Sequence, residues 1–153
     1  MTADYSYLLS RMEKYCAYQE RCVFEVEHKL GQWKAQPQVI EKIINELINN
    51  GFIDEERFAR VYAGSKFRLK KWGKNRIYRE LKMRKIPDIY IEMGLNEIDD
   101  EEYIGMIRQL ITKKDALLKD DNPIRREQKI AAFVIGKGYK PGLVWSVLKE
   151  TYN

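Results

Sequence analysis

Apolar residues recur at helical spacing along almost the whole chain, and no segment alternates as a half-buried strand would. The clearest set is Ile40, Ile43, Ile44, Leu47 and Ile48, which fall on one face of a helix. The sequence therefore predicts an all-α protein. The helices are expected to start near residues 4, 22, 37, 54, 74, 87, 100, 123 and 141.

Residues that begin and end helices lie where this pattern requires them. Asp54 and Asp99 each precede further acids, as is typical of an N-cap followed by a first turn that favours negative charge. Asn122 before a proline predicts another helix start, and Gly51 and Gly138 predict helix ends. We therefore interpret the acid clusters as caps and not as metal ligands.

The apolar pattern repeats at an offset of about 50 residues, as in tandem helical repeats. The matching positions are Val26, Ile77 and Ile130, and likewise Leu30, Leu81 and Val134. We expect three tandem three-helix repeats that form an elongated, curved helical array. The predicted repeats span residues 1–53 with the N-terminal helix, 54–99, which is basic, and 100–153.

Composition excludes several classes of protein. The chain has 153 residues, of which 44% are apolar and 33% charged, as in ordinary soluble domains. Its apolar runs are too short to cross a membrane, and its N-terminus lacks the apolar core of a signal peptide. We expect a cytoplasmic, monomeric protein with no membrane partner.

Candidate catalytic chemistry is sparse. Cys16 and Cys22 form neither a zinc motif nor a redox C-x-x-C pair, so we expect plain reduced thiols. His28 is the only histidine, and the glycines form no nucleotide-binding motif. The sequence predicts a protein that is not an enzyme and that holds no cofactor and no metal.

One window of the chain is strongly basic. From Lys66 to Lys85 ten basic residues face a single acid, Glu80, so the window carries +9 whereas the whole chain carries +5. Basic residues on solvated helix faces normally mix with acids, so such a window indicates a surface for a polyanion. The candidate binding residues are Arg57, Arg60, Lys66, Arg68, Lys70, Lys71, Trp72, Lys74, Arg76, Arg79, Lys82, Arg84 and Lys85.

Helical spacing separates this surface from the core. On the helix after Asp54 the residues expected to face the core are Phe58, Val61, Tyr62 and Leu69, and Ala59 and Ala63 are expected to allow close packing. The cations would then share the opposite face, and the next helix and the joint before it would extend the same patch. Trp72 in that joint is predicted either to stack on an unpaired base or to pack in the core.

The same residues resemble a known family. The run GFIDEERFARVY at 51–62, followed by KWGKNRIYREL at 71–81 and by Arg84-Lys85-Ile86, resembles the signature of the RecX regulatory proteins. Weaker likeness extends over nearly the whole chain. Cys22 departs from the pattern, where a capping serine is common, and Lys85 stands near a stop that usually contains glycine. We therefore expect an altered or frayed start to the second helix.

The resemblance implies a bacterial modulator of the RecA recombinase, built of three three-helix repeats. Such a protein would bind the groove of the RecA filament on DNA. It would thereby restrain the ATPase, strand-exchange and coprotease activities of RecA in recombination, DNA repair and the SOS response. Its implied partners are the RecA filament and single- or double-stranded DNA, and Arg57, Arg60, Lys71, Lys74, Arg76 and Arg79 match the family pattern as contacts.

Two other functions fit the same residues. A direct DNA-binding protein could use a helix-turn-helix-like basic module in which Lys74, Asn75 and Arg76 read bases. The other two repeats offer no equivalent reading surface. A helical scaffold for an acidic protein is the third hypothesis.

Overall fold

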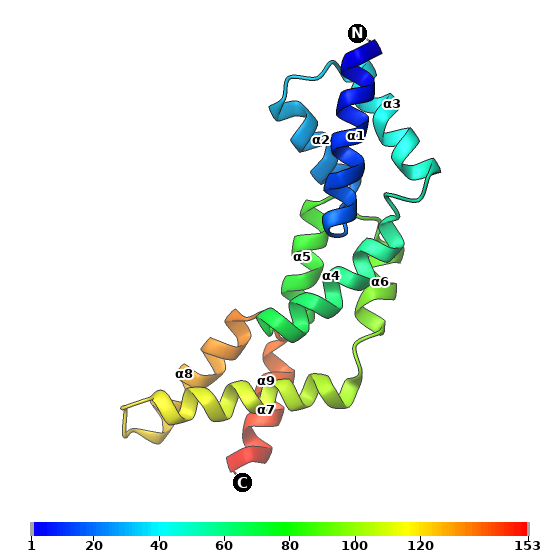
Figure 1. Cartoon of the computed structure of the whole chain (residues 1–153). Helices are drawn as coiled ribbons and strands as arrows, with labels where there is room; N and C mark the ends of the chain where they lie inside the picture. Colours follow the sequence, from blue (N-terminus) through cyan, green and yellow to red (C-terminus); the bar gives the residue numbers. More distant parts are fainter. Residues whose placement is uncertain (1, 153) are drawn as a thin grey trace. The chain divides into compact units, whose positions relative to one another are not determined.

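The computed structural model describes residues 2–152, and every regular element within them is an α-helix (Figure 1). The helices are α1 (Thr2–Tyr18), α2 (Val23–Gln32), α3 (Pro37–Asn49), α4 (Glu55–Lys70), α5 (Lys74–Met83), α6 (Asp88–Asn96), α7 (Asp100–Leu117), α8 (Pro123–Gly136) and α9 (Pro141–Tyr152). Each starts within two residues of its predicted position. None of these helices has the length and apolar composition that crossing a membrane requires.

The predicted N-caps are confirmed. The side chains of Asp54, Asp99 and Asn122 each accept the backbone N–H three residues further on, at 3.0 Å. These bonds satisfy donors that the first turn of a helix leaves without a partner. The acids at these helix starts therefore have the structural role that the sequence predicts.

Cys22 does not delay the start of α2. The carboxylate of Glu25 accepts the backbone N–H of Cys22 at 3.3 Å, and Glu55 from α4 accepts that of Val23 at 3.0 Å. Burial raises the pKa of Glu55. Because two carboxylates cap α2, its start is altered, as expected, and it is not frayed.

The chain forms two compact units. The first unit is Met1–Tyr62 with Leu81–Gly94, and the second is Ala63–Glu80 with Leu95–Asn153. Their boundary falls inside α4, α5 and α6. The order of three helix triplets agrees with the predicted repeats, whereas the repeat limits at 53 and 99 stay a prediction.

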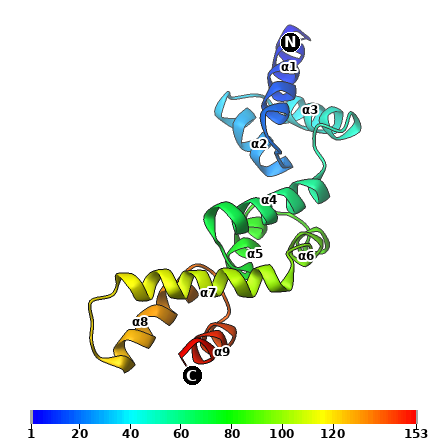
Figure 2. The same cartoon turned by 60° about the horizontal axis from the view of Figure 1, so that its bottom comes forward.

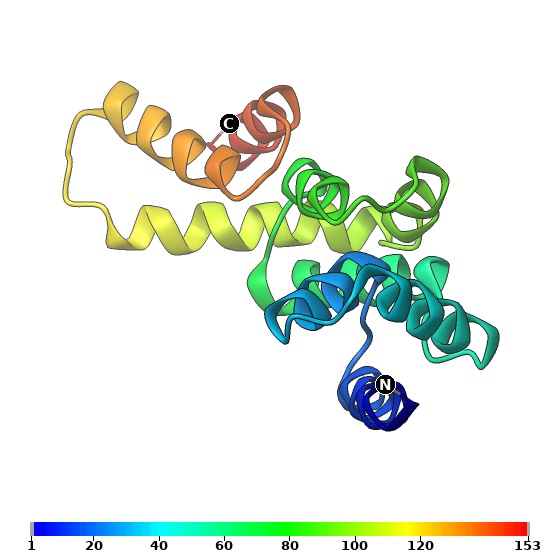
Figure 3. The ribbon, with the colours of Figure 1, turned by 90° about the horizontal axis from the view of Figure 1, so that it is seen from above.

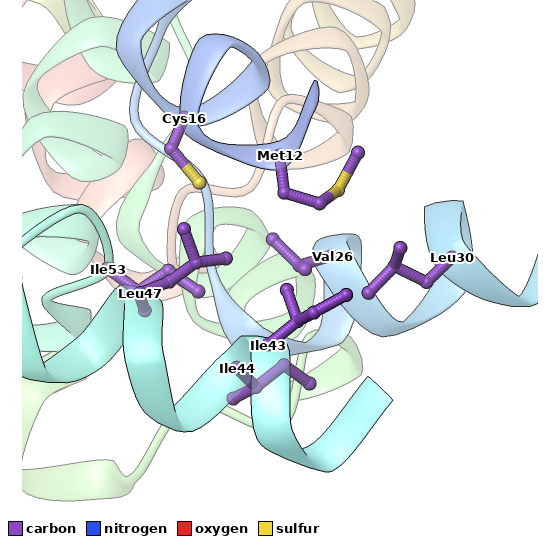
Figure 4. Close-up of a cluster of buried hydrophobic side chains, with 8 residues drawn as sticks. All are labelled: Met12, Cys16, Val26, Leu30, Ile43, Ile44, Leu47 and Ile53. Atoms are coloured by element: carbon purple, nitrogen blue, oxygen red, sulfur yellow. The ribbon is translucent and has the colours of Figure 1, made fainter. Parts of the chain in front are cut away.

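In the first unit, α1 and α2 both pack against α3. Figure 4 shows the buried cluster between them, which consists of Met12, Cys16, Val26, Leu30, Ile43, Ile44, Leu47 and Ile53. Both cysteines are free and buried, and burial raises the pKa of Cys16 to about 11 and that of Cys22 to about 12. They are unreactive core side chains at neutral pH.

In the second unit, α7, α8 and α9 pack on one another (Figure 2). Ile107, Ile130 and Val144 are among the side chains that they bury completely or nearly so. The loop between α7 and α8 is visible in Figure 3. The guanidinium of Arg126 holds it by donating to the carbonyl oxygens of Asp115 and Asp120, at 2.7 and 2.6 Å.

The repeat offset correctly identifies core positions. All six of the matched residues Val26, Ile77, Ile130, Leu30, Leu81 and Val134 are at most 1% exposed. One part of the core prediction was wrong, because Val61 and Leu69 are 46% and 79% exposed. The other part was correct, because Phe58, Ala59 and Ala63 are buried.

Small residues bring α4 close to its neighbours. Ala59 and Ala63 are completely buried, and Phe67 extends the same face of α4. A Cβ atom on Gly94 of α6 would lie 2.7 Å from the carbonyl oxygen of Ala59, so α6 approaches α4 through backbone. The close packing expected at Ala59 and Ala63 is therefore confirmed.

The second helix of each triplet is followed by a residue with a left-handed backbone. Its φ is 59° at Lys34, 59° at Lys85 and 108° at Gly138. At Lys85 the backbone N–H donates to Lys82 O at 2.9 Å, and the next N–H donates to Leu81 O at 3.1 Å. This is the usual glycine-type helix stop, formed here by a lysine.

We expect Lys85→Gly to raise the free energy of unfolding by about 1 kcal/mol, because glycine adopts a left-handed backbone without steric strain. Lys113→Gly, at an exposed position inside α7, is the matched control. It should lower the free energy of unfolding by about 1 kcal/mol. Urea denaturation followed by circular dichroism measures both. A loss of stability in Lys85→Gly would contradict the assignment.

Candidate polyanion-binding surface at the α4–α5 joint

The joint between α4 and α5 consists of Lys71, Trp72 and Gly73. Lys71 has a left-handed backbone with φ 61°, and the N–H of Trp72 donates to Lys66 O at 3.2 Å. These features end α4 and turn the chain directly into α5. The centre of the basic window is therefore an ordered turn.

This joint is held by the turn between α8 and α9. The N–H of Gly73 donates to Lys137 O at 2.9 Å, and that of Asn75 donates to Gly138 O at 3.0 Å. A Cβ on Gly73 would lie 2.4 Å from the carbonyl carbon of Gly138, and a Cβ on Gly138 would lie 2.4 Å from the Cβ of Arg76. Both glycines are required because the two backbone segments touch directly.

Two buried tyrosines form hydrogen bonds with the backbone at the two ends of the joint. The hydroxyl of Tyr139 donates to Lys71 O at 3.0 Å, and the N–H of Lys74 donates to the hydroxyl oxygen of Tyr103 at 2.8 Å. Their ring centroids lie 5.1 Å apart, and burial raises the pKa of both phenols. Side chains from the third triplet thus fix backbone atoms on both sides of Trp72.

Cations lie beside two aromatic rings, Trp72 in the joint and Tyr103 in α7. The guanidinium of Arg76 lies 4.3 Å from the ring centroid of Trp72, and the ammonium of Lys66 lies 5.3 Å from it. The ammonium of Lys74 lies 4.9 Å from the centroid of Tyr103. Trp72 is half-buried and contacts cations, so it is not a fully buried core side chain, and its stacking on a base stays a prediction.

The candidate residues divide into two groups by their charge partners. Among the candidate cations, all of which lie within residues 2–152, those that form no ion pair are Arg68, Lys70, Lys71, Lys74, Arg76, Arg79 and Lys85. All of them except Lys85 belong to the second unit. Six positive charges therefore remain uncompensated within 12 residues of one unit.

The other group is ion-paired inside the first unit. The pairs are Arg57 with Glu20 at 2.9 Å, Arg60 with Glu56 at 3.1 Å, Lys82 with Asp88 at 3.0 Å and Arg84 with Glu25 at 3.5 Å. Arg57 also donates to Gly51 O at 3.1 Å. These cations already have structural partners, so a ligand would have to compete for them.

The structure thus brings together Lys66, Arg68, Lys70, Lys71, Trp72, Lys74, Arg76 and Arg79 in the second unit. Arg57, Arg60, Lys82, Arg84 and Lys85 belong to the first unit. Sequence reasoning did not identify Tyr103, Gly138 and Tyr139 as the residues that hold the joint. The one sequence signal near them is Gly138, which predicts a helix end and no contact with the joint.

The first turn of α5 has little capacity left to bind a phosphate through its backbone. Helix N-termini bind anions because their first N–H groups lack partners. Here the N–H groups of Gly73, Lys74 and Asn75 all donate to groups of the third triplet. Anions must therefore be bound by the side chains around the joint.

Comparison with known proteins agrees with this architecture of three-helix repeats. A family model described as the second three-helix domain of RecX matches residues 54–95, which include the joint. A solved structure described as regulatory protein RecX superimposes with a TM-score of 0.87 at 25% identity, covering 97% of this chain and 75% of that one. RecX from Lactobacillus salivarius has the same fold, with a TM-score of 0.85, 24% identity, and coverage of 98% and 97%.

Named relatives carry the same description. The regulatory protein RecX of Clostridium acetobutylicum is 27% identical over 98% of this chain and 71% of that protein. That of Lactobacillus delbrueckii subsp. bulgaricus is 27% identical over 90% of this chain, which spans about half, 51%, of its length. The class is an all-α protein of tandem three-helix repeats. The chain belongs to the RecX family.

We expect Gly73→Ala to lower the free energy of unfolding by about 3 kcal/mol, because the added methyl group would overlap backbone atoms of the α8–α9 turn. Gly105→Ala in α7 is the control. Nothing lies within 4 Å of its added Cβ, so the higher helix propensity of alanine should raise the free energy of unfolding by about 1 kcal/mol. Guanidinium denaturation measures both, and a Gly73→Ala variant of native stability would refute the direct backbone contact.

Proposed function

We propose that this protein is a regulator that binds the RecA filament on DNA and restrains its ATPase, strand-exchange and coprotease activities. The observation that carries the proposal is the group of cations without ion pairs around a rigid joint. Family membership indicates the kind of partner. Such a regulator would act in the cytoplasm as a monomer, without catalysis of its own.

Rigidity of the joint matters for affinity. Lys71 and Lys74 are adjacent to backbone atoms bonded to Tyr139 and Tyr103, and Arg76 is held against Trp72. Because these groups are ordered before binding, less conformational entropy is lost when they meet an anionic partner. A filament offers both DNA phosphates and protein carboxylates, and each neutralised phosphate adds a salt-sensitive increment to affinity.

Direct reading of DNA by a helix-turn-helix module is the second candidate. It would require the first turn of α5 to enter a groove. The backbone N–H groups of Gly73 and Asn75 donate to the α8–α9 turn, which therefore lies against the start of α5. Because this turn would hinder entry of α5 into a groove, the packing favours the filament proposal. A scaffold for an acidic protein would use the same cations. Inhibition of RecA ATPase by the native protein distinguishes the first proposal from such a scaffold.

The test reverses the charge of four cations in and beside the joint. We expect Lys70→Glu, Lys71→Glu, Lys74→Glu and Arg76→Glu together to raise the concentration needed for half-inhibition of RecA ATPase on single-stranded DNA on the order of a hundredfold. RecA from the same bacterium is titrated with each form. Circular dichroism should show unchanged helix content.

A matched control carries the same change in net charge. Lys42, Lys113, Lys119 and Lys149 are exposed, and their joint replacement by glutamate should leave inhibition within about twofold of native. Full inhibition by the folded joint variant would refute the assignment of the surface. No inhibition by the native protein at stoichiometric ratios would refute the proposed function itself.

A further inference from the structure

The first unit carries a separate set of cations and aromatic rings, on α1 and α2. The guanidinium of Arg11 lies 5.0 Å from the ring centroid of Trp33 and 5.7 Å from that of Tyr7. The ammonium of Lys29 lies 5.8 Å from Trp33 and 5.6 Å from Tyr15. Three rings and two cations thus lie beside one another on this helix pair.

This side of the unit is hollowed. Two open hollows of about 560 and 340 Å³ adjoin, and the stacked pair of Arg11 and Trp33 lines both. The smaller hollow contains four cations, Arg11, Lys14, Arg21 and Lys29, and no acid lines it. Tyr18 at its edge is 83% exposed, the largest value among the exposed large apolar side chains described.

Overall charge does not explain this concentration of cations. Residues 1–34 contain five acids and five bases, so the segment as a whole is neutral. Two of the acids are bonded away from the smaller hollow, because Glu20 pairs with Arg57 and Glu25 pairs with Arg84. The fold has therefore left bases as the only charged residues that line the smaller hollow.

A similar arrangement occurs within the second unit. Trp72 there is flanked by Arg76 and Lys66, as Trp33 is flanked by Arg11 and Lys29. Each tryptophan lies just after a helix end, at Trp33 after α2 and at Trp72 after α4. The two units thus carry similar chemistry at positions that the repeat offset does not relate.

We propose that the smaller hollow on α1 and α2 is a second binding site, which takes single-stranded nucleic acid. Phosphates contact Arg11, Lys14, Arg21 and Lys29, and a base stacks on Tyr18. An acidic peptide would satisfy the cations but would leave the exposed ring without a partner. Duplex DNA would hide the faces of its bases, whereas an unpaired base can stack on an aromatic side chain.

The test uses DNA alone, so it does not depend on the proposed RecA function. Binding of fluorescein-labelled oligo(dT) of about 20 nucleotides is followed by anisotropy at several salt concentrations. We expect Lys14→Glu with Lys29→Glu to weaken binding by about tenfold or more and to flatten the salt dependence. Arg21 is left intact because its Nε donates to Tyr15 O at 3.2 Å and supports the fold.

Matched variants separate charge from stacking. Lys113→Glu with Lys119→Glu, both exposed on and after α7, makes the same charge change and should leave binding within about twofold of native. Tyr18→Ala should weaken oligo(dT) binding by about fivefold, and Tyr18→Phe should restore it, because stacking needs the ring and not the hydroxyl. The affinity for duplex DNA should be equal in all three forms of residue 18.

The same binding is then measured in the variant that combines Lys70→Glu, Lys71→Glu, Lys74→Glu and Arg76→Glu, here called the joint variant. It should retain oligo(dT) binding that Lys14→Glu with Lys29→Glu then removes. Loss of all binding in the joint variant alone would overturn the second site. Native affinity in a folded Lys14→Glu, Lys29→Glu protein would overturn it as well, and equal competition by polyglutamate would reassign the hollow to an acidic protein.

Discussion

Direct backbone contact between the α4–α5 joint and the α8–α9 turn is the constraint on which the second unit depends. Gly73 and Gly138 allow this contact because any side chain at either position would overlap its neighbour. The contact uses N–H groups that a turn and a helix start would otherwise leave unsatisfied. It also places the two buried tyrosine hydroxyls against the remaining polar backbone atoms.

The consequence is a charged surface whose backbone is rigid and whose side chains are available. Exposed cations beside acids contribute little to stability, and they are poor contacts for a ligand because a partner must displace the acid. Arg57 and Arg84 are of this kind, since they pair with Glu20 and Glu25. The cations of the joint lack such partners, so their charge is available for a polyanion.

Local features of the fold could be predicted from the sequence. Helical periodicity, caps at Asp54 and Asp99, and the stop at Gly138 correctly gave the order and starts of the helices, because each depends on residues within a few positions. The repeat offset also identified core residues such as Ile77 and Leu81. Membership of the RecX family, suggested by residues 51–86, is confirmed by the comparisons.

Contacts between distant residues could not be predicted in this way. Gly73 and Gly138 are 65 residues apart, and no periodic signal marks a glycine as touching another backbone. Close packing at Ala59 and Ala63 was expected, but Val61 and Leu69 were wrongly placed in the core, because helical spacing alone does not decide which neighbouring face of α4 points inward. The pairing of Arg57 with Glu20 likewise depends on the folded unit, so its charge alone made it look available.

Native-state hydrogen exchange of the amides of Gly73, Lys74 and Asn75 measures whether the α4–α5 joint is rigid. We expect these amides to be as strongly protected as those of Ile130 and Val134 in the core of α8, because they open only when the unit unfolds. Exchange at the rate of an open surface turn, while α8 stays protected, would contradict this expectation. The joint would then be a mobile loop and not a rigid frame for its cations.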